Sequence, residues 1–419
     1  MAERPFDVVL FGATGFVGAL TAEHLAAAGG PGTRVALAGR SPERLAEVRS
    51  RLGEPGRDWA LVEVDATDAV GLRRLAARTT VLATTVGPYA RDGRHVVTAC
   101  AEEGTHYADL TGELLFVRWA LETVDARARE TGARIVHSCG FDSIPSDLGV
   151  LLTADRASAD GEGTLADTTL VVRSMRGGIS GGTIDSARQQ AIALQADPSL
   201  RRVLRAPDAL GPRQADEPAP RSQTRSGRLG RLRRWAGPER DPETGHWLGR
   251  FVMADYNTRV VRLSNALSDG AYGRAFRYRE VSDLGPSPLA PLLAVGMDVG
   301  LGALQRGLGW TPTRRVLDRI LPRPGQGPSP EQRAAGRFRM EITATTTTGA
   351  RYRTTVAADQ DPGYDGTAVM LGQSALCLAL DGPRLPQRAG VLTPATALGD
   401  ALVARLRAHG FTFEVARLS

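Results

Sequence analysis

The chain has 419 residues, a formal net charge of +6 and 52 basic side chains, all of which are arginine. The absence of lysine excludes sites that need a lysine amine: Schiff-base catalysis, pyridoxal phosphate attachment, the Walker phosphate loop and the Tyr-x-x-x-Lys catalysis of short-chain dehydrogenases. Residues 221–240 hold seven arginines and one glutamate, so this segment carries the whole charge excess. The basicity is therefore local and does not indicate a basic fold.

Length and cysteine usage suggest a multidomain protein without disulfides. At about 150 residues per domain, the chain is long enough for two to three domains. Its three cysteines, Cys100, Cys139 and Cys377, form no C-x-x-C pair, which argues against a disulfide framework or a zinc site, and no metal ligands are predicted. A strand-like segment follows the first five residues, with no signal peptide before it. We therefore expect a cytoplasmic protein.

The first 140 or so residues alternate between short apolar runs and helical stretches. Strands are predicted at 6–11, 34–38, 61–65, 80–86, 105–112 and 133–139, and helices at 20–29, 41–53, 67–79, 91–104 and 113–132. Such alternation with short connections is typical of a parallel sheet covered on both faces. The sequence therefore predicts an α/β fold that begins with a doubly wound Rossmann domain over residues 1–148.

The pattern after residue 148 indicates a second, α+β domain. A strand is predicted at 166–175, a helix at 183–197, a hairpin of strands 336–348 and 350–360 around Gly349, and helices at 365–380 and 393–410 before a last strand at 411–418. We assign residues 149–390 to a substrate or oligomerisation domain with an Arg/Pro/Gly-rich insertion at 206–245. The C-terminal helix and strand, 391–419, are candidates for packing back on the Rossmann domain.

Residues 284–309 are apolar but interrupted by Asp298 and several glycines. They lack the roughly 18 uninterrupted apolar residues that a membrane-spanning helix needs. Two interpretations stay open: a packed pair of helices, or an element that contacts a lipid surface or an acyl chain and would bring the protein to the periphery of a membrane.

A glycine-rich turn between the first strand and the first helix carries the strongest signal for function. It consists of Gly12, Ala13, Thr14, Gly15, Phe16, Val17 and Gly18. The first glycine allows a tight turn, the second lets the backbone approach a pyrophosphate, and the third allows close packing of helix on strand. Helix amides then face the anion. The turn therefore predicts a dinucleotide site.

The end of the second strand predicts which dinucleotide binds. NAD-binding sites carry Asp or Glu about 20 residues after the glycines to hold the ribose 2′-hydroxyl. This chain has Arg40 and Ser41 there and no carboxylate. A guanidinium beside a hydroxyl suits a 2′-phosphate, so NADP is the predicted cofactor. Asp65, at the end of the third strand, is a candidate for the adenine edge and equally for a helix cap.

The loop after the fourth strand is expected to meet the ribose and nicotinamide, because ligands of open α/β sheets lie beyond the carboxyl ends of the strands. It contains Val86, Gly87, Pro88 and Tyr89. Tyr89 is a candidate catalytic residue that could donate a proton, or it could simply form a wall of the pocket.

The segment 138–147, which leads into the second domain, supplies two further candidate catalytic residues. Asp142 and Ser143 could orient the substrate. The alternative is that Asp142, like Ser146, caps the following helix. Backbone amides near Gly87 and Gly140, together with the Ser143 hydroxyl, are candidates for stabilising an enolate.

Several motifs together resemble the saccharopine dehydrogenase-like oxidoreductases, and most closely the bacterial trans-acting enoyl reductases. They are GATGFVG, AGRS, VGPY, DLTGE and GFDSIPSDLG in the first 150 residues, then SGGTIDS, PGYDGTAVM, SALCLAL and GVLTPATALGD. The resemblance implies a Rossmann domain that binds NADP and a second α+β domain. It also implies NADPH-dependent reduction of an activated C=C bond in an acyl or polyketide-type substrate.

Two alternatives to enoyl reduction stay open. One is oxidation or reduction of a C–N bond, as in the true saccharopine enzymes. The other is a non-catalytic NADP-binding protein that serves a partner or a lipid surface. Expected partners are a carrier-bound acyl substrate, an acyl-carrier protein or polyketide synthase docked by the basic segment 221–240, and a second copy of the chain. The sequence contains no recognised nucleic-acid-binding module, so specific nucleic-acid binding is not expected.

Overall fold

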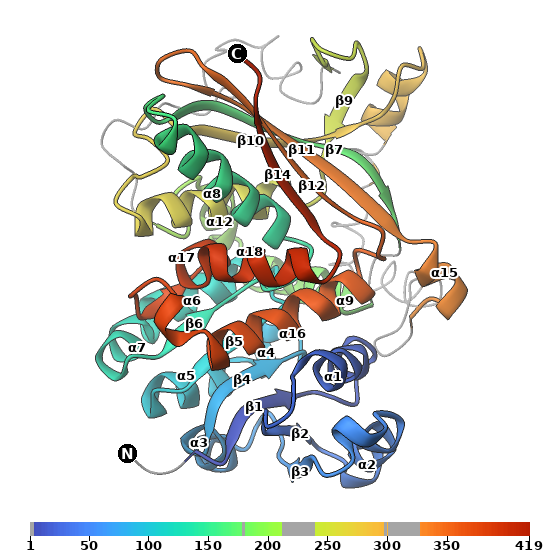
Figure 1. Cartoon of the computed structure of the whole chain (residues 1–419), viewed down its shortest axis with the longest axis vertical. Coiled ribbons are helices and arrows are strands. Elements are labelled where there is room, and N and C mark those ends of the chain that lie inside the picture. The colour runs from blue at the N-terminus through green and yellow to red at the C-terminus, as the bar shows by residue number, and fades with distance from the viewer. Residues whose placement is uncertain (1–3, 178–180, 212–238, 297–299, 301–326) are drawn as a thin grey trace.

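The structure is a computed structural model that describes residues 4–177, 181–211, 239–296, 300 and 327–419. Two sheets stand one above the other, with helices between them (Figure 1). Of the Arg/Pro/Gly-rich insertion at 206–245, the structure describes residues 206–211 and 239–245. Of the apolar segment 284–309, it describes residues 284–296 and 300. No helix of the described residues is long and apolar enough to cross a membrane.

The first sheet confirms the predicted Rossmann fold. Its seven strands are all parallel, in the order β13-β6-β5-β4-β1-β2-β3. The strands are β1 (Phe6–Phe11), β2 (Val35–Gly39), β3 (Ala60–Glu63), β4 (Thr79–Thr84), β5 (His106–Asp109), β6 (Arg134–Val136) and β13 (Gly390–Leu392). The chain reverses its direction of winding between β1 and β4, which in such sheets is where ligands bind.

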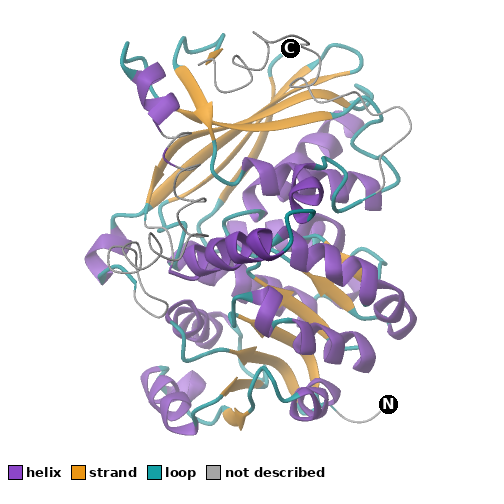
Figure 2. Cartoon of the chain, turned by 180° about the vertical axis from the view of Figure 1, so that it is seen from behind, coloured by secondary structure: helices purple, strands orange, loops and turns teal. Residues whose placement is uncertain are grey.

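Alternating side chains divide this sheet between two cores. Val8 and Leu10 of β1 belong to one buried cluster, while Val9 and Phe11 point into the other. Helices cover both faces (Figure 2). Those of the N-terminal part are α1 (Phe16–Ala28), α2 (Pro42–Arg51), α3 (Ala69–Ala77), α4 (Tyr89–Asp92), α5 (Arg94–Glu103), α6 (Leu114–Thr123) and α7 (Asp125–Thr131), with a 3-10 turn at Glu54–Gly56.

The second sheet confirms the predicted α+β part. Its order is β14-β12-β11-β7-β10-β9-β8, with β7 and β10 parallel and the other pairs antiparallel. The strands are β7 (Leu165–Arg176), β8 (Glu239–Arg240), β9 (Trp247–Arg250), β10 (Arg277–Asp283), β11 (Arg337–Thr346), β12 (Arg351–Ala358) and β14 (Thr412–Arg417). β11 and β12 form the expected hairpin, in which Gly349 has a φ of +95° that suits glycine.

The remaining helices join the two sheets. They are α8 (Ile144–Ala159), α9 (Gly181–Ala196), α10 (Leu200–Arg205), α12 (Ala254–Leu267), α15 (Pro330–Ala334), α16 (Asp365–Leu380), α17 (Pro394–Ala397) and α18 (Gly399–Ala408), with a 3-10 turn at Gly382–Arg384. α8 packs on β11 and β12, whereas α16 packs on α1, β4 and β5. One buried hydrophobic cluster therefore continues from the Rossmann sheet into the second sheet.

The C-terminal part returns to the Rossmann sheet earlier than residue 391. α16 already covers that sheet, and β13 extends it beside β6, whereas β14 pairs with β12 of the second sheet. The single helices expected at 91–104, 113–132 and 393–410 are each two helices, which meet at Gly93, Val124 and Leu398. Apolar periodicity continues across these breaks, so it did not reveal them.

Candidate active site

The turn between β1 and α1 forms a cradle that requires glycine. Gly12 has a φ of +92°, and a Cβ there would lie 2.8 Å from the Thr85 hydroxyl oxygen. A Cβ on Gly18 would lie 2.1 Å from the Gly12 carbonyl oxygen. α1 therefore approaches the turn at a distance that any larger residue would prevent.

The N-terminus of α1 suits an anion. Gly15 precedes the helix without a side-chain cap, and the first turn contains no acidic residue. The first N–H groups of a helix have no acceptor within it, and the helix dipole favours negative charge at this end. The cradle and these amides together fit a dinucleotide pyrophosphate.

Arg40 extends into solvent at the end of β2, beside this cradle. Its side chain is 80% exposed, and the Asp65 carboxylate lies 3.9 Å from its Nε. An exposed pair at this distance contributes little, so the guanidinium keeps its capacity to bind phosphate. Asp65 itself accepts the backbone N–H and the hydroxyl of Thr67, which lower its pKa. The cap of the next helix is Asp68, so Asp65 closes a local turn instead.

A second arginine, which was not predicted, joins Arg40. Ser41 caps α2 by accepting the backbone N–H of Arg44, with Pro42 in the first turn as expected. The Arg44 guanidinium donates to the Thr14 carbonyl oxygen over 3.2 Å. From the first turn of α2, Arg44 therefore reaches back to the glycine turn.

Tyr89 is the first residue of α4, directly after the loop that follows β4. The side chain is buried, and its hydroxyl donates to the Thr84 carbonyl while accepting the Leu110 N–H. Burial, followed by the nearby Asp109 carboxylate, raises its pKa well above the usual range. Of its two predicted roles, these contacts favour a wall that holds the loops after β4 and β5 together.

Glu113 links three segments at this edge and was not among the predicted site residues. Its carboxylate accepts the backbone N–H groups of Tyr89 and Ala90, each over 2.8 Å, and the Ser186 hydroxyl of α9 over 2.7 Å. Desolvation is the main cause that raises its pKa. Glu113 therefore fixes the start of α4 and ties the loop at residues 86–88 to the second domain.

The ends of β5 and β6 are joined by a buried polar group around Asp109. Its carboxylate accepts His137 Nδ1 over 2.7 Å, the Tyr107 hydroxyl, and two backbone N–H groups. Next to it, Ser138 has a φ of +65°, which is rare for a residue other than glycine. The Ser138 hydroxyl contacts the Thr111 carbonyl and, over 2.6 Å, the Tyr256 hydroxyl of α12. Tyr256 thus brings the second domain onto this edge.

Asp142 is the one predicted catalytic residue whose side chain keeps its polar atoms available. The residue as a whole is half-buried, and its carboxyl group has no hydrogen-bond or ion-pair partner within the part of the chain that the structure describes. Burial raises its pKa to about 6. Burial is the main cause that raises the pKa of the Tyr256 phenol, and the Asp142 carboxyl group adds to it after those of Asp109 and Glu113.

Ser143 is hydrogen-bonded to another side chain. Its hydroxyl is fully buried and donates to Asn257 Oδ1 over 2.9 Å. Asn257 donates in turn to Ser146 and to the buried carboxylate of Glu280, whose pKa burial raises to about 7. Ser143 also occupies the N-cap position of α8, without a side-chain cap bond. Ser146 and Asp142, the two residues predicted as possible caps, are not at the N-cap position. Ser146 lies within the first turn of α8, and Ser143 precedes the helix.

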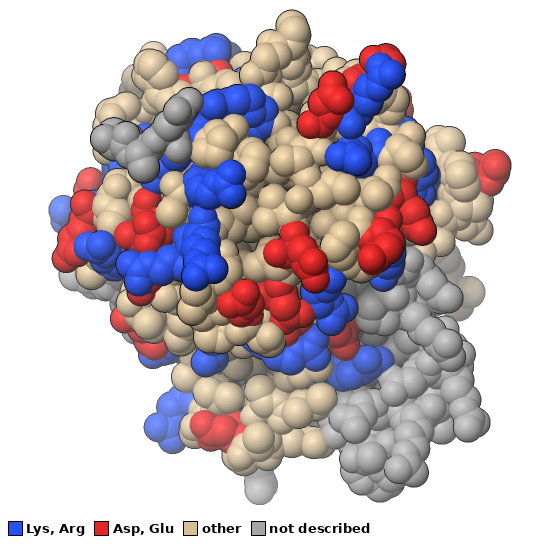
Figure 3. Space-filling view, turned by 90° about the horizontal axis from the view of Figure 1, so that it is seen from below, with Lys and Arg blue, Asp and Glu red and all other residues tan. Residues whose placement is uncertain are grey.

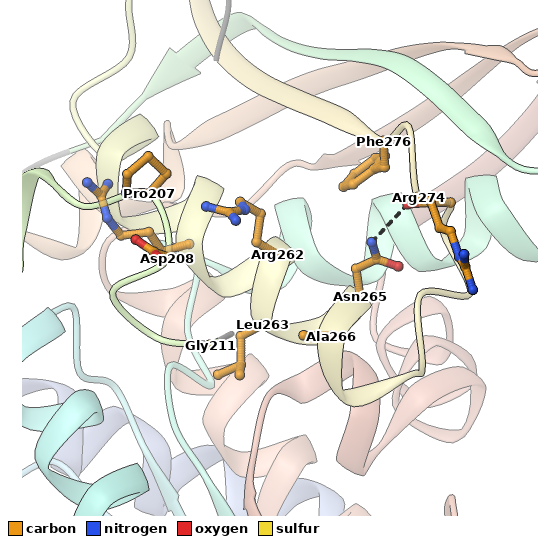
Figure 4. Close-up of a pocket in the computed structure, with 11 residues that line it drawn as sticks. Pro207, Asp208, Gly211, Arg262, Leu263, Asn265, Ala266, Arg274 and Phe276 are labelled. Atoms are coloured by element: carbon orange, nitrogen blue, oxygen red, sulfur yellow. Dashed lines mark hydrogen bonds between the residues drawn. The ribbon is translucent and has the colours of Figure 1, made fainter. Parts of the chain in front are cut away.

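A separate small pocket lies on the second domain (Figure 4). It is lined by α12 and the segments 207–211 and 273–276. Its polar groups serve the fold: Arg259 donates to the Leu204 and Ala206 carbonyls, and Asn265 Nδ2 donates to the Gly273 carbonyl. The cofactor edge of the first sheet, not this pocket, is the candidate active site.

Comparisons with known proteins identify the family. Over 426 residues, the chain is 49% identical to a trans-acting enoyl reductase of Mycobacterium tuberculosis, a match that covers 100% of this chain and 99% of the relative. The chain belongs to the trans-acting enoyl reductase family. A trans-acting enoyl reductase of Mycobacterium ulcerans is 46% identical over 429 residues, with 100% and 99% coverage. Residues 8–136 match the family model named saccharopine dehydrogenase NADP binding domain. The protein is therefore an oxidoreductase whose cofactor is NADP.

The fold is similar to that of a solved protein. The apo saccharopine dehydrogenase (L-Glu forming) of Saccharomyces cerevisiae superposes with a TM-score of 0.54 at 14% identity, covering 98% of this chain and 99% of that one. This likeness shows a shared fold. Together with the family model, it confirms the resemblance drawn from the motifs.

Proposed function

We propose that this protein uses NADPH to reduce an activated carbon–carbon double bond in an acyl chain carried by the acyl-carrier protein of a polyketide synthase. The names of its full-length relatives support the reaction class. In the structure, the observation that carries the proposal is Asp142. Its carboxyl group has a pKa raised by burial, has no polar partner among the described residues, and follows β6 at the edge of the sheet that also presents the glycine cradle.

NADPH supplies a hydride to the β-carbon of the substrate when it is bound. The residues assigned to hold it are Gly12, Ala13, Thr14, Gly15, Phe16, Val17, Gly18, Arg40, Ser41, Asp65, Val86, Gly87 and Pro88. Asp142 in its acid form then gives a proton to the α-carbon and is protonated again from water. Backbone amides near Gly87 and Gly140 stabilise the negative charge on the thioester oxygen.

The two other predicted catalytic residues take positioning roles. Ser143 orients the 140–143 segment through Asn257, and Tyr89 holds the loop at 86–88 against the end of β5. Of the three predicted catalytic residues, the proposal therefore assigns only Asp142 to the reacting carbon atoms. It leaves the Ser143 hydroxyl out of the group that stabilises the enolate.

The reaction is tested by following NADPH absorbance with matched substrates. A trans-2-enoyl thioester on an acyl-carrier protein should be reduced, and the same acyl group on a small thiol should be reduced more slowly. A 2-oxo acid with an amine tests the alternative C–N reaction. Turnover of the 2-oxo acid with the amine, without turnover of the enoyl thioester, would refute the proposal. Tight NADPH binding with no turnover on either would favour the non-catalytic alternative.

Docking of the carrier by the basic segment is a further part of the proposal. Most of residues 221–240 lies outside the described residues. Elsewhere, basic and acidic side chains are intermixed on the end of the molecule seen in Figure 3, consistent with a local charge excess. Deleting 221–240 should raise KM for the carrier-bound substrate at low salt and leave the small thioester unaffected. A second copy of the chain and a lipid surface stay predicted partners.

A further inference from the structure

The second domain reaches the glycine turn at the ring of Phe16. This ring packs edge-on against Tyr364, with centroids 5.1 Å apart, and the guanidinium carbon of Arg333 lies 5.7 Å from its centroid. Gly327 adjoins the same ring, since a Cβ there would lie 2.3 Å from a ring carbon. Residues distant in sequence therefore lie beside the first turn of α1, where the pyrophosphate is expected.

The hydrogen bonding of Arg333 is incomplete. Its side chain is 17% exposed and forms an ion pair with Asp365 at the start of α16. Its Nε is buried and has no hydrogen-bond partner within the described part of the chain. A buried N–H without an acceptor costs free energy, so such groups in native proteins usually meet a partner. The hydrogen bonding of this guanidinium therefore leaves room for a further acceptor.

We propose that Arg333 is a cofactor-binding residue, whose guanidinium donates to the pyrophosphate held by α1. The planar guanidinium has five N–H donors, so binding Asp365 leaves others for phosphate oxygens. The cation–π contact with Phe16 fixes its position beside the helix end. The first turn of α1 has no acidic residue that would oppose this arrangement. The second domain would thereby share in binding the cofactor, independently of which bond the enzyme reduces.

Equilibrium titration separates this role from that of Arg40. Binding of NADPH and NADH to the full chain is followed by nicotinamide fluorescence, without any substrate. Arg333→Gln should raise the Kd of both by a similar factor, about tenfold to a hundredfold, because both carry the pyrophosphate. Arg40→Ala is the matched control, and it should weaken NADPH alone. An Arg333→Gln variant that binds both dinucleotides like the wild type, or loses only NADPH, would overturn the proposal.

A second pair of variants excludes a purely structural role. Asp365→Asn removes the ion pair but keeps the guanidinium, so both Kd values should stay within about twofold of the wild type. Arg333→Lys keeps the charge without the planar fork and should lie between the wild type and Arg333→Gln. Thermal unfolding of each apo protein is measured alongside. If Asp365→Asn weakens binding as much as Arg333→Gln with an equal loss in Tm, Arg333 only supports the fold and the proposal fails.

Discussion

The active site has two edges that are built in different ways. The cofactor edge follows β1, β2 and β4 and consists of residues 12–18, 40–41 and 85–88. The substrate edge follows β5 and β6 and consists of residues 109–113 and 137–143 with their partners on α9, α12 and β10. Backbone shape and exposed arginines form the first edge, whereas buried side chains with raised pKa values form the second. Substitutions at the cofactor edge should therefore weaken cofactor binding through steric clashes. Substitutions at the substrate edge should lower the reaction rate through the loss of a proton donor or a hydrogen bond.

The largest effect on cofactor binding is expected from Gly18→Ala, at the cofactor edge. The added Cβ would meet the Gly12 carbonyl at 2.1 Å, so α1 must move away from the turn that holds the pyrophosphate. We expect NADPH affinity to fall by about a hundredfold or more, equivalent to about 3 kcal/mol, at every pH. Gly382→Ala is the control, because a Cβ there meets nothing within 4 Å. A Gly18→Ala protein that binds NADPH normally would show that the cradle does not need this close approach.

The substrate edge should respond to Asp142→Asn through pH. A proton donor acts in its acid form, and burial raises the pKa of Asp142 to about 6. The kcat/KM of the wild type should therefore fall about tenfold per pH unit above 6. Asp142→Asn should lower kcat/KM at pH 5.5 by a factor of about 10² to 10⁴. It should also abolish the decline of kcat/KM above pH 6.

Ser143→Ala is the matched control for Asp142. Removing the adjacent hydroxyl breaks the bond to Asn257 but leaves the acid in place, so the rate should drop while the midpoint of the pH profile stays near 6. Asp142→Glu should recover part of the rate. If Asp142→Asn keeps the same decline above pH 6, another group donates the proton.

The sequence could predict a cofactor edge because its signals are local. Glycine spacing, the Ser41 cap and the missing acid near Arg40 all lie within one βαβ unit. At the substrate edge, Asp142 could be proposed from its place after a strand. Tyr256 and Asn257 could not, since only the packing of α12 across the sheet edge brings them there.

Other features had too weak a local signal or depended on distant contacts. β13 has three residues and is a strand only because it pairs with β6. Arg333 stands among many arginines in a chain without lysine, so its type carried no information. Its position beside Phe16 depends on tertiary packing.

A change in stability rather than in activity is expected at Glu280, behind the substrate edge. Burial is the largest cause that raises its pKa to about 7, although it accepts the Tyr278 hydroxyl and the Asn257 amide. Between pH 4.5 and 7 the folded protein holds a proton that the unfolded chain has released. The free energy of unfolding must then fall as pH rises through this range, and the loss is complete above about pH 7. It amounts to about 3 kcal/mol at most.

Glu280→Gln should remove this part of the pH dependence, because glutamine stays neutral. Below pH 4.5 the variant should be less stable than the wild type by about 1 kcal/mol, since its amide meets the Asn257 amide where the carboxyl oxygen accepted a bond. Urea unfolding at pH 4.5, 6 and 8 measures both effects, with the exposed Glu47→Gln as the control. An unchanged difference between pH 4.5 and 8 in Glu280→Gln would mean that the buried carboxyl group ionises in the folded protein much as it does in the unfolded chain. The contrast between a steric edge and a titrating edge would then rest on Asp142 and Glu113.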